Sequence, residues 1–197
     1  MRVALFGGTG RLGRHVLRLA LERGHEVRAH ARSPEALGER NGLTAVRGDL
    51  ADAASIREAI TGCDAVLSCV GHAKGQEPRV YGEGMRHIVA AMGEGSIRRL
   101  VAISGAGLEL EGDASGLGRR LVILLLRVVA RQVLEGKQHE WDVIRGADLD
   151  WTLVRVPRMV ERPGAGSVSV DLRQVRGSPM VPYPDVAAWM LDRAGDA

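Results

Sequence analysis

The stretch Gly7-Gly8-Thr9-Gly10-Arg11-Leu12-Gly13 decides the fold of this chain. It follows a short apolar run at residues 3–6 and opens a segment in which Leu12, Val16 and Leu19 recur at helical spacing. Glycines after a strand allow a tight turn and close backbone approach, and the N-terminus of the next helix offers unpaired N–H groups to an anion. This order predicts a site for the pyrophosphate of a dinucleotide, formed by Gly7, Thr9, Gly10, Arg11, Leu12 and Gly13.

Strand and helix patterns alternate along the rest of the chain. Extended segments are expected at residues 25–31, 43–46, 64–70, 100–104 and 151–156, and helices at 53–60, 80–92, 117–144 and 185–192. The alternation predicts an α/β fold, a Rossmann-like doubly wound parallel sheet. No linker divides the sequence, so we expect residues 1–197 to form one NAD(P)-binding Rossmann domain. Prolines interrupt residues 157–184, which we expect to be an irregular segment on the substrate side.

Composition argues against several classes of protein. The net charge is +3, but the arginines are scattered, and three Trp, two Tyr and one Phe are too few for a base-stacking platform, so no nucleic-acid partner is expected. Cys63 and Cys69 flank a strand and, like the six dispersed His, lack metal-ligand spacing. The apolar stretch at residues 121–130 is about half of a membrane span. The chain also starts directly in a strand, so we expect a cytoplasmic protein without a membrane partner.

The end of the second strand bears on the choice of dinucleotide. NAD-binding Rossmann proteins tend to place an acidic residue there, about 20 residues after the glycines, to hold the ribose hydroxyls. This chain has His30-Ala31-Arg32-Ser33 instead. Arg32, helped by Arg11, can pair with a 2′-phosphate through its planar guanidinium, which predicts NADP(H). The alternative is that both arginines are exposed and bind nothing. After the third strand, Asp49 either hydrogen-bonds the adenine amino group or caps the next helix.

Further blocks of sequence complete a family pattern. They are Ala31-Arg32-Ser33, Gly48-Asp49-Leu50, Ser104-Gly105-Ala106, residues 149–155 and Asp185-Val186-Ala187. In this order, over nearly the whole chain, they resemble the atypical short-chain dehydrogenases/reductases, and more narrowly the NAD(P)H-binding, NmrA-like branch that includes biliverdin reductase B and flavin reductase. The resemblance implies 2′-phosphate contact at Arg32, adenine contact at Asp49 and Leu50, a nicotinamide-side wall at Val70 and Gly71, Ser104 beside the nicotinamide, and a carboxamide contact near Pro157.

Two departures from the family pattern bear on function. Val156 separates Arg155 from Pro157, where many relatives have Val-Arg-Pro, so the carboxamide contact is displaced by one residue. The pair Tyr-x-x-x-Lys, which serves as acid and base in carbonyl-reducing relatives, is also absent. The only lysines are Lys74 and Lys137, and valines stand four residues before them.

Few other residues are candidates for catalysis. Ser104 lies just past a strand. Its hydroxyl either polarises the acceptor or only forms a hydrogen bond with the backbone of its own turn. His72, in the loop after Gly71, is either a proton donor or a solvated residue. Lys137 and His139 belong to a helix that is expected to border the pocket, and surface positions are expected for both rather than a place in the pocket.

The missing acid–base pair favours an NADPH-dependent oxidoreductase that transfers hydride to a flavin, quinone or similar planar acceptor, because solvent can then supply the proton. One alternative, which the missing pair also favours, is a non-catalytic NADP(H)-binding redox sensor. Another is a ketoreductase or isomerase of a specialised pathway. The expected partner is a small-molecule acceptor. The apolar segment at residues 117–134 packs in the core, roofs the substrate site or forms a dimer contact, and the oligomeric state stays open.

Overall fold

The computed structural model describes residues 1–71, 77–105, 107–108, 110, 113, 130–171 and 180–196. A parallel six-stranded sheet with the order β3-β2-β1-β4-β5-β6 forms its centre. The strands are β1 (Arg2–Phe6), β2 (Glu26–Ala31), β3 (Leu43–Arg47), β4 (Ala65–Ser68), β5 (Arg99–Gly105) and β6 (Asp150–Val156). The order reverses between β1 and β4, and such a switch point leaves a crevice beyond the carboxyl ends of the strands.

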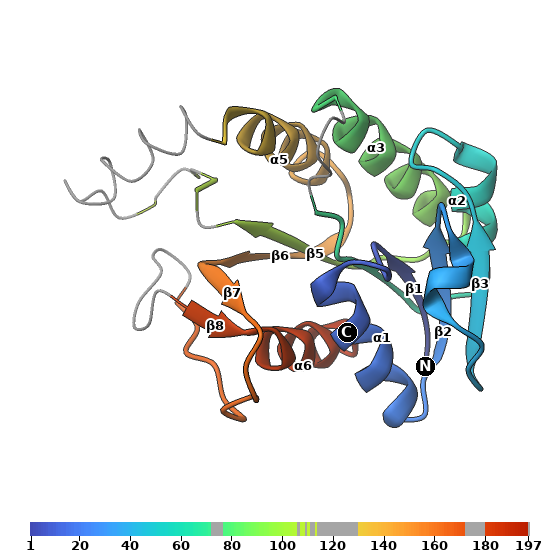
Figure 1. Cartoon of the computed structure of the whole chain (residues 1–197). Helices are drawn as coiled ribbons and strands as arrows, with labels where there is room; N and C mark the ends of the chain where they lie inside the picture. Colours follow the sequence, from blue (N-terminus) through green and yellow to red (C-terminus); the bar gives the residue numbers. More distant parts are fainter. Residues whose placement is uncertain are drawn as a thin grey trace.

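Helices cover both faces of the sheet (Figure 1). On one face lie α1 (Arg11–Glu22) and α6 (Tyr183–Ala194), and on the other α2 (Ala53–Ile60), α3 (Arg79–Glu94) and α5 (Arg131–Ile144). A short 3-10 helix, η1 (Pro34–Leu37), follows β2. The predicted Rossmann-like doubly wound fold is confirmed.

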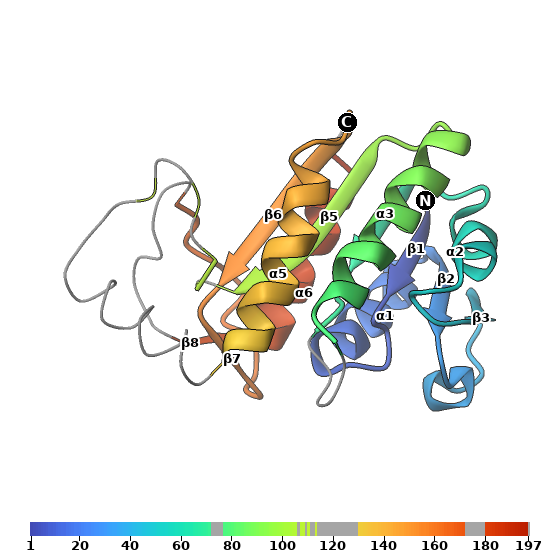
Figure 2. The ribbon, with the colours of Figure 1, turned by 90° about the horizontal axis from the view of Figure 1, so that it is seen from above.

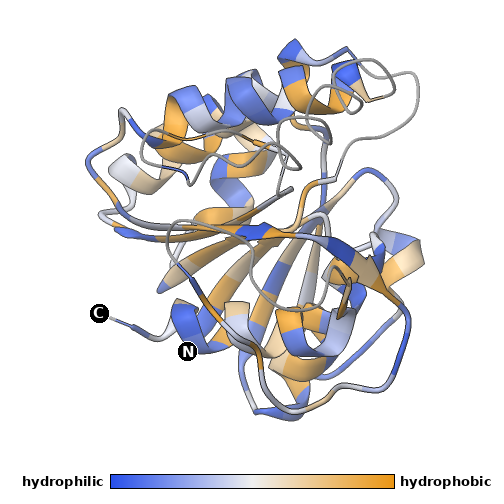
Figure 3. Cartoon of the chain, turned by 90° about the vertical axis from the view of Figure 1, so that its left-hand side faces the viewer, coloured by the Kyte–Doolittle hydropathy of each residue, from blue (hydrophilic) through white to orange (hydrophobic). Residues whose placement is uncertain are grey.

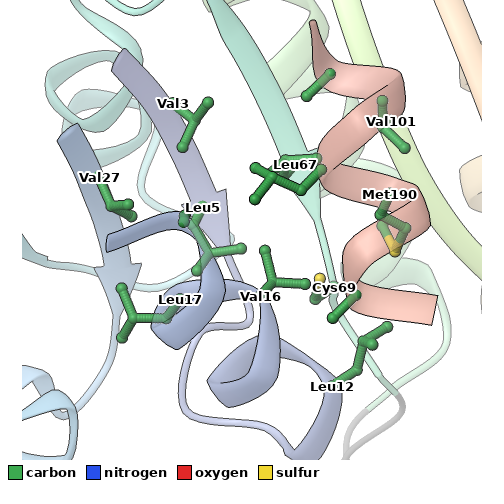
Figure 4. Packing of buried hydrophobic residues seen from close by; sticks show 14 of the residues in the cluster. Val3, Leu5, Leu12, Val16, Leu17, Val27, Leu67, Cys69, Val101 and Met190 are labelled. Atoms are coloured by element: carbon green, nitrogen blue, oxygen red, sulfur yellow. The ribbon is translucent and has the colours of Figure 1, made fainter. Parts of the chain in front are cut away.

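The core consists of two apolar layers separated by the sheet. Alternate residues of β1 supply them: Val3 and Leu5 face α1 and α6, whereas Ala4 and Phe6 face the opposite helices. Figure 4 shows the first layer, and Figure 3 shows the apolar residues gathered between the helices and the sheet. Cys63 and Cys69 are buried in these layers, and burial raises the pKa of the Cys69 thiol to about 12.

The element boundaries differ from the predicted ones mainly toward the C-terminus. Within the predicted helix 117–144, the described helix begins at Arg131, and residues 114–129 lie outside the described residues. The last helix begins at Tyr183, because Pro184 is tolerated in a first helical turn.

Two short strands, β7 (Arg158–Val160) and β8 (Met180–Pro182), pair in parallel within the segment predicted to be irregular. Within the described ranges, no helix is long and apolar enough to cross a membrane.

Candidate functional site

A cavity of about 400 Å³ lies beyond the carboxyl ends of β1, β2, β4 and β5. Of the thirteen residues predicted to bind the cofactor, ten line it: Gly7, Thr9, Gly10, Arg11, Leu12, Arg32, Asp49, Leu50, Val70 and Gly71. Gly13, Ser104 and Pro157 do not, and His72 lies outside the described residues. The place of Pro157 in the lining is taken by Met159, two residues further along the chain.

The three glycines of the turn have different roles. Gly7 has a φ of +79°, and a Cβ there would lie 2.6 Å from the carbonyl oxygen of Cys69. A Cβ on Gly13 would overlap the carbonyl oxygen of Gly7. Gly10 is exposed, and among the described residues a Cβ there would approach just one atom, that same oxygen, at 3.2 Å. The fold therefore requires Gly7 and Gly13, whereas Gly10 leaves space on the ligand side.

Helix α1 begins directly at the cavity. Gly10 is its N-cap, no side chain caps the helix, and its first turn contains no acidic residue. The N–H groups of this turn and the positive end of the helix dipole are therefore available to an anion. This arrangement suits a pyrophosphate group.

Two exposed arginines on the cavity wall are not committed to carboxylates. Among the described residues, neither Arg11 nor Arg32 takes part in an ion pair, although both line the cavity. Arg47 of β3, by contrast, pairs with Glu35 and donates a hydrogen bond of 3.1 Å to the carbonyl oxygen of Arg32. The guanidinium groups of Arg11 and Arg32 are thus accessible to an anionic ligand.

The alternative role for Asp49 as a helix cap is wrong. Helix α2 is capped by Asp52, whose Oδ1 accepts hydrogen bonds from the backbone N–H groups of Ala54 and Ser55, at 3.0 and 3.2 Å. Asp49 lies too early in the chain to reach them. Its Oδ1 accepts from the N–H of Ala51 at 3.1 Å, and the residue lines the cavity, where the adenine role stays a prediction.

His30 is a cavity residue to which sequence reasoning assigned no role. It is buried at the end of β2, and its Nε2 lies 2.9 Å from the Oγ of Ser55. Burial lowers the pKa of His30 below its ordinary value. A Cβ on Gly48 would collide with both of these side chains, so glycine lets the segment that carries Asp49 pass close over them.

Lys137 and His139 are not at the surface, and that prediction is wrong. The Nζ of Lys137 donates to the carbonyl oxygens of Val70 at 2.7 Å and Ile103 at 3.2 Å, and to the carboxylate of Glu140 at 2.7 Å. His139 packs against Gly82 of α3, and its Nδ1 is buried without a hydrogen-bond partner among the described residues. This face of α5 points inward because the helix packs on both α3 and the sheet.

The Lys137–Glu140 pair joins the segment after β4 to strand β5 at the edge of the cavity. Their side chains are 12% and 5% exposed, and burial raises the pKa of the Glu140 carboxyl while the adjacent ammonium opposes the rise. Val70 and Ile103 both line the cavity, so the pair fixes the distance between two parts of its wall. All three protons of the ammonium group are used in these bonds.

Ser104 lies at the end of β5 with its side chain buried. It is 3% exposed, and its Oγ has no hydrogen-bond partner within the described part of the chain. The reading in which the hydroxyl satisfies its own turn is therefore wrong for the described residues. A buried hydroxyl without a partner costs about 1–3 kcal/mol, and Ser104 directly follows Ile103, which lines the cavity.

Both tyrosines of the chain line the cavity, which the sequence analysis missed. Tyr81 comes from the first turn of α3, and Tyr183 is the first residue of α6. The Tyr183 ring stacks on His15 with centroids 5.8 Å apart, and the Nε2 of His15 lies 2.8 Å from a carboxylate oxygen of Glu161. Aromatic residues at helix starts near the carboxyl edge of the sheet were the available signal.

A family model described as NAD(P)H-binding matches residues 7–197. The chain belongs to this NAD(P)H-binding family. Its curated relatives include cinnamoyl-CoA reductase 1 of Petunia hybrida, 31% identical over 119 residues, which are 53% of this chain and 35% of that protein. A 3-beta-hydroxysteroid dehydrogenase of Mycolicibacterium neoaurum is 30% identical over 124 residues, 57% of this chain and 34% of that protein. The match thus spans about a third of the length of these relatives.

Solved structures share the fold of this NAD(P)H-binding family member. The anaerobilin reductase ChuY of Escherichia coli O157:H7 is 19% identical with a TM-score of 0.80, and the alignment covers 99% of this chain and 91% of ChuY. A short-chain dehydrogenase/reductase of Veillonella parvula, solved in complex with NADP, is 18% identical with a TM-score of 0.79, covering 99% and 88% of the two chains. The resemblance to atypical short-chain dehydrogenases/reductases is confirmed.

The curated relatives named above are a reductase and a dehydrogenase, and the family model itself describes NAD(P)H binding. The residues on the cavity wall fit such a cofactor. The open side of the turn at Gly10 and the uncapped start of α1 suit a pyrophosphate.

Proposed function

We propose that this family member is an NADPH-dependent oxidoreductase that transfers hydride to a flavin, quinone or similar planar acceptor. One observation carries the proposal. The cavity joins an uncapped helix start at the glycine turn to two arginines, Arg11 and Arg32, that have no carboxylate partner among the described residues. A dinucleotide with a 2′-phosphate satisfies all of these groups.

Each part of the wall has a role in this proposal. The turn and the start of α1 hold the pyrophosphate, Arg32 and Arg11 hold the 2′-phosphate, and Asp49 with Leu50 contacts the adenine. Val70 and Gly71 line the nicotinamide side. Since Met159 lines the cavity and Pro157 does not, we assign the carboxamide contact to the chain from Pro157 to Met159.

The chemical step needs little from the protein when the acceptor is a flavin or quinone. The bound cofactor supplies a hydride. Ser104 orients and polarises the acceptor, and solvent supplies the proton. The segment at residues 157–184 covers the acceptor side, which is supported by Met159 and Tyr183 in the cavity wall.

The proposal extends to the whole chain. Residues 1–197 act as one domain with a small-molecule acceptor and with neither nucleic acid nor membrane as partner. The buried free thiols of Cys63 and Cys69 suit a reducing compartment, which supports the cytoplasm as its location.

Oxidation of NADPH in the presence of FMN or menadione tests the proposal. We expect steady turnover with at least one of the two acceptors. Gly10→Val is the control, because a protein that folds but does not bind the cofactor must be inactive. Tight NADPH binding without turnover would instead favour the redox sensor. The sensor is supported by Val133 of α5, which stands four residues before Lys137, where carbonyl-reducing relatives have the tyrosine of Tyr-x-x-x-Lys.

A further inference from the structure

Tyr81 of α3 lies beside the part of α5 that carries Lys137. The side chain is 3% exposed and lines the cavity. Its ring packs over Gly136, since a Cβ on Gly136 would lie 3.0 Å from the Cδ2 of Tyr81. Figure 2 shows α3 and α5 side by side on the same face of the sheet. Gly136 directly precedes Lys137, so the Tyr81 ring on the cavity wall lies beside the turn of α5 from which Lys137 reaches the residues of that wall.

Lys137 locates this region relative to the strands. Its ammonium group donates to the carbonyl oxygens of Val70, two residues after β4, and of Ile103 in β5, and both residues line the cavity. Val70 and Gly71 are the residues assigned above to the nicotinamide side. Tyr81 therefore shares a wall with the groups that face the reacting end of the cofactor.

We propose that Tyr81 is the proton donor of this site, so that α3 supplies the acid that α5 lacks at Val133. The inference rests on the proposed function and narrows its acceptor. A positioned acid is of use when the oxygen of a carbonyl group becomes negatively charged, so the substrate class is a conjugated carbonyl compound such as an aromatic aldehyde.

The step balances with the groups at hand. The carbonyl carbon receives hydride, the π electrons of the C=O bond move to the oxygen, and that oxygen takes the phenolic proton of Tyr81. The product is an alcohol, and the phenolate regains a proton from solvent.

Tyr183 lines the same cavity but is less suited to this role. Its ring stacks on His15 of α1, the helix whose start is assigned to the pyrophosphate. Tyr183 is therefore the matched control, because Tyr→Phe removes one hydroxyl from the same cavity in each case.

The experiment compares the unmodified protein with Tyr81→Phe and Tyr183→Phe, using NADPH with 4-nitrobenzaldehyde or FMN as acceptor. We expect Tyr81→Phe to lower turnover of the aldehyde by about 100-fold or more, and turnover of FMN by much less. Tyr183→Phe should reduce both acceptors' turnover to a similar extent. NADPH affinity, measured by calorimetry, reports whether each variant still folds and binds the cofactor.

Binding of the aldehyde to the NADP⁺ complex, which cannot turn over, is a second readout. Loss of one hydrogen bond in Tyr81→Phe should weaken this binding by about 2- to 10-fold, whereas Tyr183→Phe should not. If NADPH does not bind to the unmodified protein, the proposed function fails and this inference falls with it. If FMN is reduced but the aldehyde is not, or if the two variants lose aldehyde turnover equally, Tyr81 is not the donor while the proposed function stands.

Discussion

The glycine turn and the Lys137–Glu140 pair both shape the cavity, but they do so by different means. The turn consists of consecutive residues, and its geometry comes from backbone close to backbone at Gly7 and Gly13. The pair acts over a distance in the chain, since Lys137 bonds to Val70 and Ile103, 67 and 34 residues away. A site formed by consecutive backbone residues can be recognised in the sequence as a motif. A site formed by tertiary contacts cannot, because it depends on how the helices pack.

The largest expected effect separates the two roles of glycine within the turn. Gly13→Val should destabilise the protein by about 4 kcal/mol or more, because its Cβ would overlap a backbone oxygen that has no room to move. Gly10→Val should stay folded and lose NADPH affinity by at least about 100-fold. Urea unfolding and calorimetry measure the two effects. A folded Gly10→Val protein with unchanged affinity would mean that the turn is only structural.

The buried pair provides the next largest effect. Glu140→Gln should lower the free energy of unfolding by about 3 kcal/mol, because it leaves the Lys137 ammonium buried without a counter-charge. Glu135→Gln on the same helix is the control. Its partner Arg131 is exposed, and the change should be below about 0.5 kcal/mol. Equal effects in urea unfolding would contradict a structural role for the buried pair.

Ser104 should have a smaller effect, on rate rather than on stability. Ser104→Ala should lower kcat about tenfold, equivalent to about 1.4 kcal/mol of barrier, with nearly unchanged NADPH affinity. Its buried hydroxyl, which has no partner among the described residues, orients the acceptor in the proposed function and is not required as the acid. A loss well above 100-fold in steady-state rate would make Ser104 part of a proton relay.

The smallest effect concerns His30 at the adenine side. Burial lowers the pKa of the folded His30 below its ordinary value of 6.5, so as the pH falls below that value the unfolded chain takes up a proton before the folded one. Stability due to this group is thus complete above about pH 6.5 and decreases toward acid, by at most about 1.4 kcal/mol per pH unit. Urea unfolding between about pH 7.5 and about pH 5.5 should show a shallower slope for His30→Gln. If the free energy of unfolding of His30→Gln falls with pH as steeply as that of the unmodified protein, other groups cause the acid sensitivity.

The regular elements of the fold could be predicted from the sequence because their signals are local. The apolar run before Gly7 and the helical spacing after it placed β1 and α1 correctly. The position of Arg32 in the cavity wall could be predicted in the same way, because residues that follow a parallel strand lie at the crevice beyond its carboxyl end.

The other side of the cavity could not be predicted in the same way. Lys137 looked like a surface residue because helical periodicity gives the faces of a helix but not which neighbour covers them. The roles of Tyr81 and Tyr183 depend on α3 and α6, which reach the cavity only through the packing of the whole sheet. The sequence analysis considered only Asp49 as a cap of the next helix, whereas α2 starts at Ala53 and Asp52 caps it.

Titration of the unmodified protein with NADPH and with NADH tests the central claim most directly. We predict that NADPH binds about 10- to 100-fold more tightly, as expected for charge-assisted hydrogen bonds between Arg32 and a 2′-phosphate. Arg32→Ala should narrow this gap, whereas Arg86→Ala, at an exposed position of α3, should not. Equal affinities of the unmodified protein for NADPH and NADH would contradict the claim.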